Sequence, residues 1–375
     1  PMGTTPLALA ALAVPPTLPR GGVSFLPKRT KNNFFFRRQG LGRWRALSAG
    51  AMAPTMVEVK AKGAGGLSLD AGVWHRRWGV WAGSWRPSVE EWNHALSLLP
   101  QPDREKISKF LYLEDAKARL IGRLLIRQLS EKLGCSDSSV VRLPSGRPVI
   151  SEAPKSVEFS LAHDGEWVLL EASNANIMVG CDIVQTTRGT QLERIKDRVF
   201  TEEEWKQVCE CGSDHMRQIR LMRRWAVKEA IVKALGVGLK YGMKNIDVTL
   251  VDEPQDDCQE LLRTGNGERP RKIRLADFLN SKNIREYGSS PSNDANLDAE
   301  IAHSPIGMAN ARLGMSAEEE WRNKPLPSNW RLETGRLDRN HIWASALAQP
   351  KCEGEVSDSL GATPVKLISV SELLE

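Results

Sequence analysis

Apolar residues in the middle of the chain recur with two different periods. Across residues 104–133 they return every three or four positions, which predicts two consecutive helices. Across 73–84 they alternate with polar residues and include three tryptophans, which predicts a strand. Between these segments, Ser88 is followed three residues later by Glu91. This is the spacing of a capping box, so a helix is expected over 88–99.

The pattern continues with short apolar runs separated by turns. We expect strands at 157–160, 167–171, 177–184 and 246–251, and a final hairpin built from 330–332 and 341–347. Helices are expected over 203–209 and 216–235. The second should end at Gly236 and Gly238, because glycine favours a left-handed C-cap.

Three stretches lack this pattern. Residues 1–57 contain eight basic side chains and no acidic one, the composition of an organellar transit peptide; an ordinary disordered tail is the alternative. A transit peptide would direct the protein to a plastid or a mitochondrion, whereas translation from Met52 or Met56 would leave it cytoplasmic. Residues 252–327 are rich in Asn, Ser, Asp, Gly and Pro and predict a mostly disordered insertion, and the tail 350–375 carries no signal.

Charge and composition exclude several classes of protein. Removing the eight basic charges of residues 1–57 from the net charge of +6 leaves −2 for the rest of the chain, so bulk charge does not support nucleic-acid binding. The sequence contains no run of about 18 apolar residues, so no transmembrane helix is predicted. The six cysteines lack the spacing of a zinc site and are expected to be free thiols.

Three short segments place ionisable residues in apolar surroundings. Asp182 lies in an apolar strand, where an unpaired carboxylate is costly, so it either meets a cation or caps a turn. Glu229 and Lys233 stand four residues apart on a predicted helix. They form either a surface ion pair or, given their apolar neighbours, part of a site. His163 ends a strand and is either structural or a phosphate contact.

Four motifs occur in a fixed order along the chain. They are a glycine–basic–proline turn at 146–148, Ser-x-Ala-His at 160–163, Val-Gly-x-Asp-Ile at 179–183 and Trp-Ala-x-Lys-Glu-Ala-x-x-Lys at 225–233. A Phe-Thr-x-x-Glu-Trp segment at 200–205 lies between the last two. Together they resemble the surfactin-type 4′-phosphopantetheinyl transferase family, and within it the larger eukaryotic members related to the aminoadipate-pathway enzyme. The resemblance covers about residues 74–252 and returns at 330–347.

The resemblance implies a fold and a domain organisation. The expected fold class is α/β (α+β), with two similar αβ halves packed as a pseudo-dimer and coenzyme A at their junction. The N-terminal half would comprise 73–165, and the C-terminal half 166–251 plus 328–349. No internal sequence repeat marks the two halves.

The resemblance also implies site residues. Asp182 and Glu229 are the expected Mg²⁺ ligands, and carboxylates suit this ion. Lys233 is expected to contact the coenzyme A phosphates, and these three residues form the catalytic group. Further coenzyme A contacts are expected from Lys106, Ser145, Gly146, Arg147, Pro148, Val149, Ile150, Ser160, Leu161, Ala162 and His163. Some bacterial members carry a second acid where Val184 stands here, and a water would take its place.

The implied reaction is a Mg²⁺-dependent transfer of 4′-phosphopantetheine from coenzyme A, the co-substrate, to a serine of an apo acyl carrier protein, releasing 3′,5′-ADP. This is the activity of a holo-[acyl-carrier-protein] synthase in fatty acid biosynthesis. Glu229 is the hypothesised general base and Glu204 the second candidate. A monomer without nucleic-acid or membrane partners is expected. The alternatives are an inactive carrier-protein-binding homologue, which should lack the Asp or the Glu, and a basic RNA-associated protein, which the charge of −2 disfavours.

Overall fold

The computed structural model of the chain describes most of the region from residue 69 to the C-terminus. The described residues are 69, 72–143, 145–188, 193–210, 213–238, 241–251, 272–280, 305–313, 327, 329–338, 340–349 and 363–375. The expected targeting segment, 1–57, lies outside them. None of the described helices is long and apolar enough to cross a membrane.

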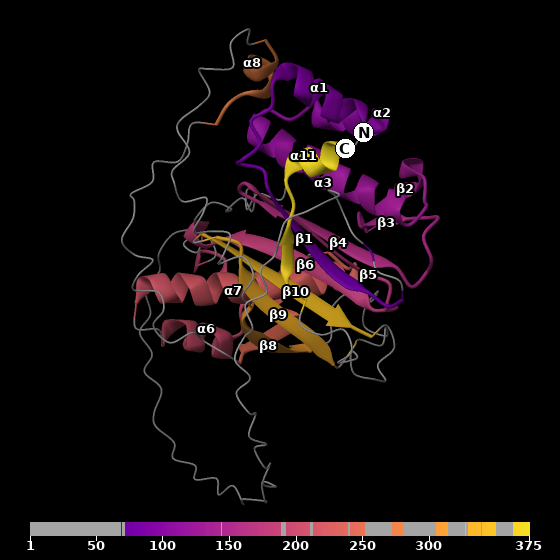
Figure 1. Ribbon diagram of the computed structural model, residues 1–375. Coiled ribbons are helices and arrows are strands. Elements are labelled where there is room, and N and C mark those ends of the chain that lie inside the picture. Colours follow the sequence, from indigo (N-terminus) through magenta and orange to yellow (C-terminus); the bar gives the residue numbers. More distant parts are fainter. Residues whose placement is uncertain are drawn as a thin grey trace, which may run out of the picture. The chain divides into compact units, whose positions relative to one another are not determined.

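The first sheet has four strands in the order β11-β1-β5-β4. They are β11 (Val365–Leu367), β1 (His75–Trp81), β5 (Trp167–Ser173) and β4 (Glu158–Asp164). Strand β5 is antiparallel to both β1 and β4, whereas β11 runs parallel to β1. The helices of this half lie together on one side of the sheet (Figure 1). They are α1 (Val89–Ser97), α2 (Gln101–Ile107), α3 (Leu113–Lys132), α8 (Leu275–Asn280) and α11 (Val370–Leu374).

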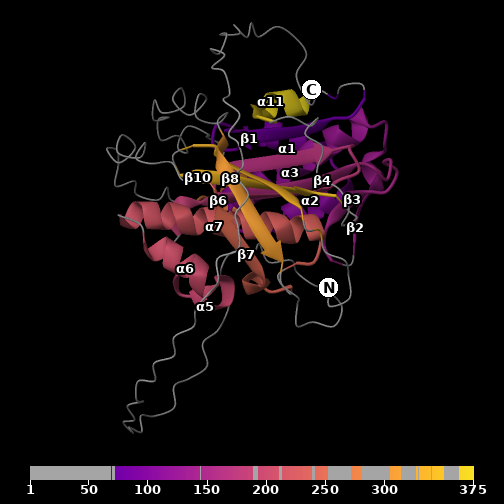
Figure 2. The same cartoon turned by 90° about the horizontal axis from the view of Figure 1, so that it is seen from below.

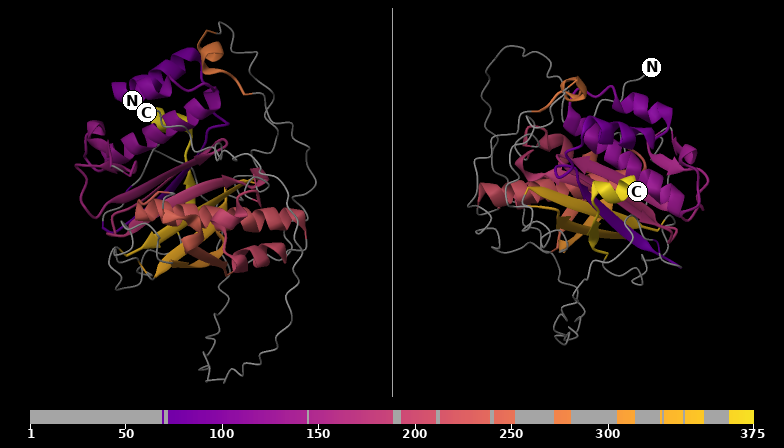
Figure 3. Two further views of the ribbon diagram at one scale, coloured as in Figure 1. Left: turned by 180° about the vertical axis from the view of Figure 1, so that it is seen from behind. Right: turned by 45° about the horizontal axis from the view of Figure 1, so that its top comes forward.

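The second sheet has five strands in the order β6-β10-β9-β8-β7. They are β6 (Met178–Gln185), β10 (His341–Ala348), β9 (Trp330–Arg336), β8 (Pro305–Leu313) and β7 (Ile246–Leu250), and each neighbouring pair is antiparallel. Helix α7 (Asp214–Leu235) packs along β6 and β10 (Figure 2). Helix α6 (Glu202–Cys209) runs beside α7 (Figure 3). The short α5 (Lys196–Val199) precedes α6 in the chain.

The remaining elements are short. Strands β2 (Val140–Arg142) and β3 (Pro148–Ile150) form a separate hairpin around the glycine–basic–proline turn. The 3₁₀ turns are η1 (Asp137–Ser139), η2 (Thr186–Arg188) and η4 (Met243–Asn245).

Local sequence signals explain the helix ends. Helix α1 begins with the expected capping box, in which Ser88 and Glu91 each accept the other's backbone N–H. Helix α7 begins at the N-cap Ser213 and ends at Gly236, whose φ of +67° is the left-handed conformation predicted for this glycine. These predictions and the expected final hairpin, β9–β10, are confirmed.

The two sheets meet where β4 lies beside β6. The Ser160 hydroxyl accepts the backbone N–H of Cys181 at 3.0 Å, and the Asp164 carboxylate accepts that of Gln185 at 2.8 Å. Each half is thus one sheet covered by one long helix, α3 or α7, and has its own hydrophobic core. The expected two-half α/β fold is confirmed.

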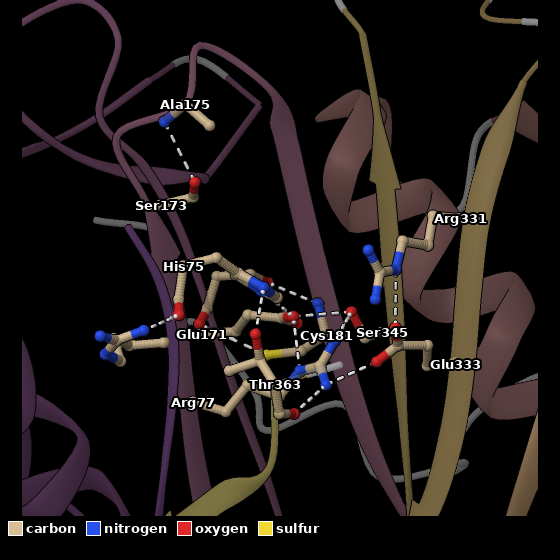
Figure 4. Close-up of polar contacts among 12 residues, drawn as sticks. His75, Arg77, Glu171, Ser173, Ala175, Cys181, Arg331, Glu333, Ser345 and Thr363 are labelled. Atoms are coloured by element: carbon tan, nitrogen blue, oxygen red, sulfur yellow. Dashed lines mark hydrogen bonds and ion pairs between the residues drawn. The ribbon is translucent and has the colours of Figure 1, made fainter. Parts of the chain in front are cut away.

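A buried polar network also joins the two sheets (Figure 4). Its centre is Arg77 on β1, which is 1% exposed. The Arg77 guanidinium donates to Glu171 on β5 at 2.7 Å and to Ser345 on β10 at 2.9 Å, and it pairs with Glu333 on β9 at 2.6 Å. It also donates to the carbonyl of Thr363 at 2.5 Å, which ties the C-terminal segment to both sheets.

The structure corrects three expected boundaries. Within the insertion predicted to be disordered, 272–280 contain α8, and 305–313 form β8 between β7 and β9. Within the tail without signal, 363–375 contain β11 and α11. Strand β5, placed after the predicted boundary at 165, pairs with β1 and β4 and so belongs to the first half.

Two of the missed elements share a physical cause. Strand β11 and helix α8 are short, and tertiary pairing or packing rather than local periodicity stabilises them. Strand β11 has three residues and is held by its pairing with β1. Helix α8 has six, of which only Leu275 and Phe278 are buried. Such elements lie below the length at which a sequence pattern identifies them.

Candidate active site

Close packing of α7 on β6 creates the site. A Cβ atom added to Gly180 would lie 2.0 Å from the carbonyl oxygen of Ala230 and 2.6 Å from the backbone nitrogen of Ala234. Only glycine allows the helix backbone to lie this close to the strand. The two alanines that meet Gly180 directly follow Glu229 and Lys233 in the chain, so this contact brings both side chains to the neighbourhood of Asp182.

Asp182 and Lys233 form the central contact of the site. The Lys233 ammonium donates to the Asp182 carboxylate at 2.7 Å and to the backbone carbonyl of Cys181 at 3.0 Å. The Asp182 side chain is 12% exposed, whereas the Lys233 side chain is 32% exposed. Lys233 is therefore positioned by the strand and still reachable from solvent.

Electrostatics couple Glu229 to this pair. Burial and then the neighbouring Asp182 charge raise the pKa of Glu229 to about 7, although Lys233 acts in the opposite direction. Burial also raises the pKa of Asp182 despite its bond to Lys233. Burial lowers the pKa of Lys233, but Asp182, Cys181 and Glu229 outweigh this effect and the net shift is upward. The carboxylates of Asp182 and Glu229 are thus both partly desolvated, and the charge of Lys233 stabilises the ionised form of each.

This arrangement fits a divalent cation whose coordination is completed by a substrate. Two ionised carboxylates and one ammonium leave a net negative charge that a cation would compensate. Mg²⁺ usually takes one or two carboxylates, with phosphate oxygens and waters as its other ligands. Among the residues that the structure describes, no group of three His, Cys, Asp or Glu side chains forms a closed metal cage. Asp182 and Glu229 have the chemistry of an open Mg²⁺ site.

His163 joins the site from the other half. It lies at the end of β4 and is exposed, yet the surrounding protein partly desolvates its ring. This desolvation, followed by the cations of Lys233 and Arg119, lowers the pKa of the imidazole. His163 is thus close enough to Lys233 to sense its charge. The structure brings together four predicted residues, Asp182, Glu229, Lys233 and His163.

Arg147, predicted to contact coenzyme A, forms its hydrogen bonds with other residues of the protein. Its guanidinium donates to the carbonyl of Ala234 at 2.9 Å, to that of Val179 at 3.3 Å and to the Glu158 carboxylate. It therefore links the last turn of α7 to the starts of β4 and β6. Gly146 before it has a φ of +87°, which explains the glycine of this turn. Ser145 lies in the same exposed turn, and Pro148, Val149 and Ile150 form β3.

The other predicted coenzyme A contacts have different environments. Ser160 is 6% exposed and bonds β6, as described above, and Leu161 packs against Gly122 of α3. Ala162 points into a core cluster on the opposite face of the strand. Lys106 is exposed on α2, and no contact in the described part of the chain joins it to Asp182, Glu229 or Lys233.

The pairing of Lys228 with Glu204 beside the site was not predicted from the sequence, which offered Glu204 only as the second candidate for the general base. Lys228 is fully buried and donates to the Glu204 carboxylate at 2.6 Å and to the carbonyl of Val199 at 2.7 Å. Glu204 also accepts the backbone N–H groups of Thr201 and Val248, at 2.8 Å each. Glu204 is 1% exposed and both its oxygens are used, so it braces α6, α7 and β7 and does not suit the role of general base. The apolar residues around Lys228 were the sequence signal that could have indicated a buried lysine in need of an acidic partner.

Comparison with known proteins agrees with this geometry. A family model described as 4′-phosphopantetheinyl transferase, N-terminal, matches residues 83–175, and one for the 4′-phosphopantetheinyl transferase superfamily matches 178–284. Together they match more than half of the chain, and the chain belongs to the 4′-phosphopantetheinyl transferase superfamily. The border between the two matches falls between β5 and β6, where the first sheet gives way to the second.

Several relatives are similar to a little under half of the chain. The L-aminoadipate-semialdehyde dehydrogenase-phosphopantetheinyl transferase of Mus musculus is 34% identical over 183 residues, which cover 46% of this chain and 59% of the mouse protein. The 4′-phosphopantetheinyl transferase Sfp of Bacillus subtilis is 29% identical over 171 residues, 45% of this chain and 74% of Sfp. The chain therefore spans less than two thirds of the mouse relative.

Proposed function

We propose that this protein transfers the 4′-phosphopantetheine group of coenzyme A to a serine of an apo acyl carrier protein. The observation that carries the proposal is the arrangement of Asp182, Glu229 and Lys233, where α7 packs on β6, with His163 contributed by the other half. Two carboxylates, a reachable lysine and a histidine suit a pyrophosphate-containing substrate.

The chain's own residues divide the work. Asp182 and Glu229 would hold Mg²⁺, which when bound neutralises charge on the pyrophosphate. Lys233 would donate to a phosphate oxygen and stabilise the charge that develops on the leaving group. His163, on the opposite side, would orient the same diphosphate. The helix–strand contact at Gly180 keeps these groups in one geometry.

Bond changes follow from this placement. The serine Oγ of the carrier forms a bond to the β-phosphorus, the bond from that phosphorus to the bridging oxygen breaks, and 3′,5′-ADP leaves with the bridging oxygen. Glu229 would accept the serine proton, because the carboxylate lies within the site beside Asp182 and Lys233. Glu204 is already saturated by Lys228 and two backbone N–H groups, which supports Glu229 over Glu204.

Intact-mass measurement of the carrier tests the proposal. The full chain is incubated with coenzyme A, Mg²⁺ and an apo acyl carrier protein. A mass gain of about 340 Da on the carrier that requires Mg²⁺ is expected from metal-dependent transfer. Asp182→Ala and Glu229→Ala should abolish it, whereas Arg127→Ala, which removes a surface ion pair with Glu131, should not. Full turnover by both Glu229→Gln and Glu229→Ala at saturating Mg²⁺ would refute the metal and base assignments.

The carrier and the compartment are part of the same proposal. The acid-free composition of residues 1–57 favours a plastid or mitochondrial acyl carrier protein, because a transit peptide would place the enzyme beside it. The name of the mouse relative assigns that protein a different acceptor. Turnover of an acyl carrier protein should therefore be compared with that of an aminoadipate-type carrier domain. No transfer to any carrier, with intact coenzyme A binding, would instead support an inactive carrier-binding homologue.

A further inference from the structure

The turn between β9 and β10 carries an aspartate and a histidine that are both largely buried. The Nδ1 atom of His341 lies 2.8 Å from each carboxylate oxygen of Asp338. The Asp338 carboxylate also accepts the indole N–H of Trp167, at 2.6 Å, and the backbone N–H of Asn340, at 2.7 Å. Although burial acts to raise the pKa of Asp338, the hydrogen bonds from His341 and Trp167 lower it. The carboxylate is therefore an ionised acceptor, and Nδ1 of His341 donates to it.

Asp338 and His341 contact the other half of the protein. Trp167 is the first residue of β5, and Gly165 lies in the turn that joins β4 to β5. A Cβ atom added to Gly165 would lie 2.5 Å from the Nε2 atom of His341, so the imidazole packs directly against this turn. His341 is 7% exposed, and its Nε2 atom has no hydrogen-bond partner among the residues that the structure describes. The hydrogen bond to Asp338 thus orients the ring, and the far edge of the ring contacts the β4–β5 turn.

The β9–β10 turn also holds the end of β6. The backbone N–H of Thr186 donates to the carbonyl of Asn340 at 2.7 Å, and the Thr186 hydroxyl donates to the same carbonyl at 3.2 Å. His341 pairs with Gln185 in the antiparallel register of β10 and β6. The backbone N–H of Gln185 donates in turn to Asp164, the last residue of β4. The β9–β10 turn therefore contacts strand ends from both halves.

Site residues lie next to these strand ends. His163 directly precedes Asp164 on β4, and Asp182 lies on β6, three residues before Gln185. Asp164 is close enough to His163 and Asp182 for its charge to act on both. A shift of the β4–β5 turn would therefore move His163 relative to the pair of Asp182 and Lys233. Such shifts matter, because a displacement of about 1 Å can cost roughly 100-fold in rate.

We propose that His341, oriented by Asp338, is a positioning residue that fixes the β4–β5 turn and thereby holds His163 opposite Lys233. The inference rests on the proposed transferase function, in which His163 and Lys233 bind the same diphosphate. His341 acts through the turn and not by contact with the reacting atoms. The hydrogen bond to Asp338 sets the angle of the ring, and the rigid ring sets its spacing from Gly165.

A kinetic double-mutant cycle between His341 and His163 tests this role. With coenzyme A, Mg²⁺ and an apo acyl carrier protein, His341→Ala should lower kcat/KM for coenzyme A by about 10- to 100-fold. In the His163→Ala background the same change should lower it by less than about twofold, because the group that His341 positions is gone. Losses that multiply fully would show that His341 does not act through His163 and would overturn the proposal. An unchanged kcat/KM for His341→Ala would also overturn it.

Variants of the ring and of the turn test the contact itself. His341→Phe keeps a flat ring beside Gly165 but cannot donate to Asp338, and it should recover part of the activity lost in His341→Ala. Gly165→Ala presses a Cβ atom onto the ring, so it should lower kcat/KM more in the wild type than in the His341→Ala background. Equal activity of His341→Phe and His341→Ala, or an equal effect of Gly165→Ala in both backgrounds, would contradict positioning by the ring.

His75 is the matched control for loss of a buried histidine. It is 3% exposed and lies 2.8 Å from the Glu171 carboxylate, but it pairs with Ser173 at the opposite end of β5 from Trp167. His75→Ala should lower the urea midpoint, as His341→Ala does, and leave kcat/KM of the folded enzyme within about twofold of the wild type. An equally large fall in kcat/KM for both variants would indicate a general weakening of the sheets, and the positioning role would be wrong.

Binding measurements keep this inference separate from the proposed function. If the wild type binds coenzyme A with Mg²⁺ in isothermal titration but transfers nothing to any carrier, the transferase proposal is wrong. The same cycle of His341 and His163 is then evaluated from the dissociation constants for coenzyme A. A loss of affinity in His341→Ala only when His163 is present would support the positioning role, and equal losses in both backgrounds would refute it.

Discussion

Replacing Arg77 by methionine should cost more stability than any surface change, because it leaves two carboxylates buried. Arg77 donates to Glu171, Ser345 and Thr363 and pairs with Glu333, and its guanidinium lies 4.7 Å from the centre of the Trp343 ring. The side chains of Arg77 and Glu171 are fully buried and that of Glu333 is 9% exposed, so solvent offers no replacement.

The magnitude follows from the desolvated charges. Breaking a buried ion pair by removing one partner costs about 3–5 kcal/mol. Methionine retains most of the apolar stem of arginine, so the loss should come from the two buried carboxylates. Glu171 then keeps His75 and Ser345 as partners, and Glu333 keeps Arg331. The free energy of unfolding of a domain is about 5–15 kcal/mol, so this loss would be a large fraction of it. The double variant Arg77→Met/Glu171→Met should lose less than Arg77→Met, because it removes one of the stranded charges.

Urea titration followed by tryptophan fluorescence measures the loss, because Trp78 and Trp343 are buried close to Arg77. Arg127→Ala is the surface control and should cost less than about 1 kcal/mol. A loss below about 1 kcal/mol for Arg77→Met, or a larger loss for the double variant, would refute the reasoning.

The pH dependence gives an independent check with a definite sign. In the wild type, Arg77 holds the pKa of Glu171 below its usual value against the opposing effect of burial. Glu171 therefore contributes stability above its unfolded pKa, and this is lost as the pH falls through the lower folded pKa. Without Arg77, burial should raise the folded pKa of Glu171 above the unfolded value. The deficit of Arg77→Met should thus shrink as the pH is lowered from 8 to about 5.

Three further changes test the framework of the site. Gly180→Ala should abolish transfer and cost about 1–3 kcal/mol or more, since the new Cβ meets the α7 backbone at 2.0 Å; normal activity in the mass assay would contradict the close contact. Lys228→Met should cost about 3–5 kcal/mol in urea titration by stranding Glu204, whereas Lys228→Met/Glu204→Gln should recover part of it. A stop codon after residue 362 should yield insoluble protein, because β11 and the Thr363 contact with Arg77 are lost; a soluble monomer with a native melting temperature would refute this.

The sequence predicts the regular elements well wherever one face is buried over a long stretch. Helix α3 and helix α7 follow the apolar spacing, and the glycine signal correctly marks the end of α7. Strand β8 was missed although residues 309–313 alternate apolar and polar side chains, because the segment around them is rich in Asn, Ser, Asp, Gly and Pro. Its place between β7 and β9 is decided by pairing. Long-range pairing leaves no local trace that periodicity can detect.

The same distinction applies to the site. Asp182, Glu229 and Lys233 could be chosen from the sequence, because ionisable residues in apolar surroundings are unusual. That these three residues lie beside one another could not be predicted from the sequence, because it depends on the contact of Gly180 with α7. Arg147 shows the limit more sharply: its motif indicates a ligand contact, whereas its guanidinium binds Glu158 and the carbonyls of Ala234 and Val179.

The two halves contribute different chemistry although they repeat one architecture. The second half presents carboxylates and Lys233 on the face where α7 covers β6, and the first half presents His163 at the end of β4. In the function proposed above, the carboxylates and Lys233 serve the metal and the diphosphate, and His163 orients the same diphosphate. The contact of β4 with β6 through Ser160 and Cys181 places them side by side. Among the described residues, the carboxylates, Lys233 and His163 come close together at this junction, and for this reason we place the proposed site there.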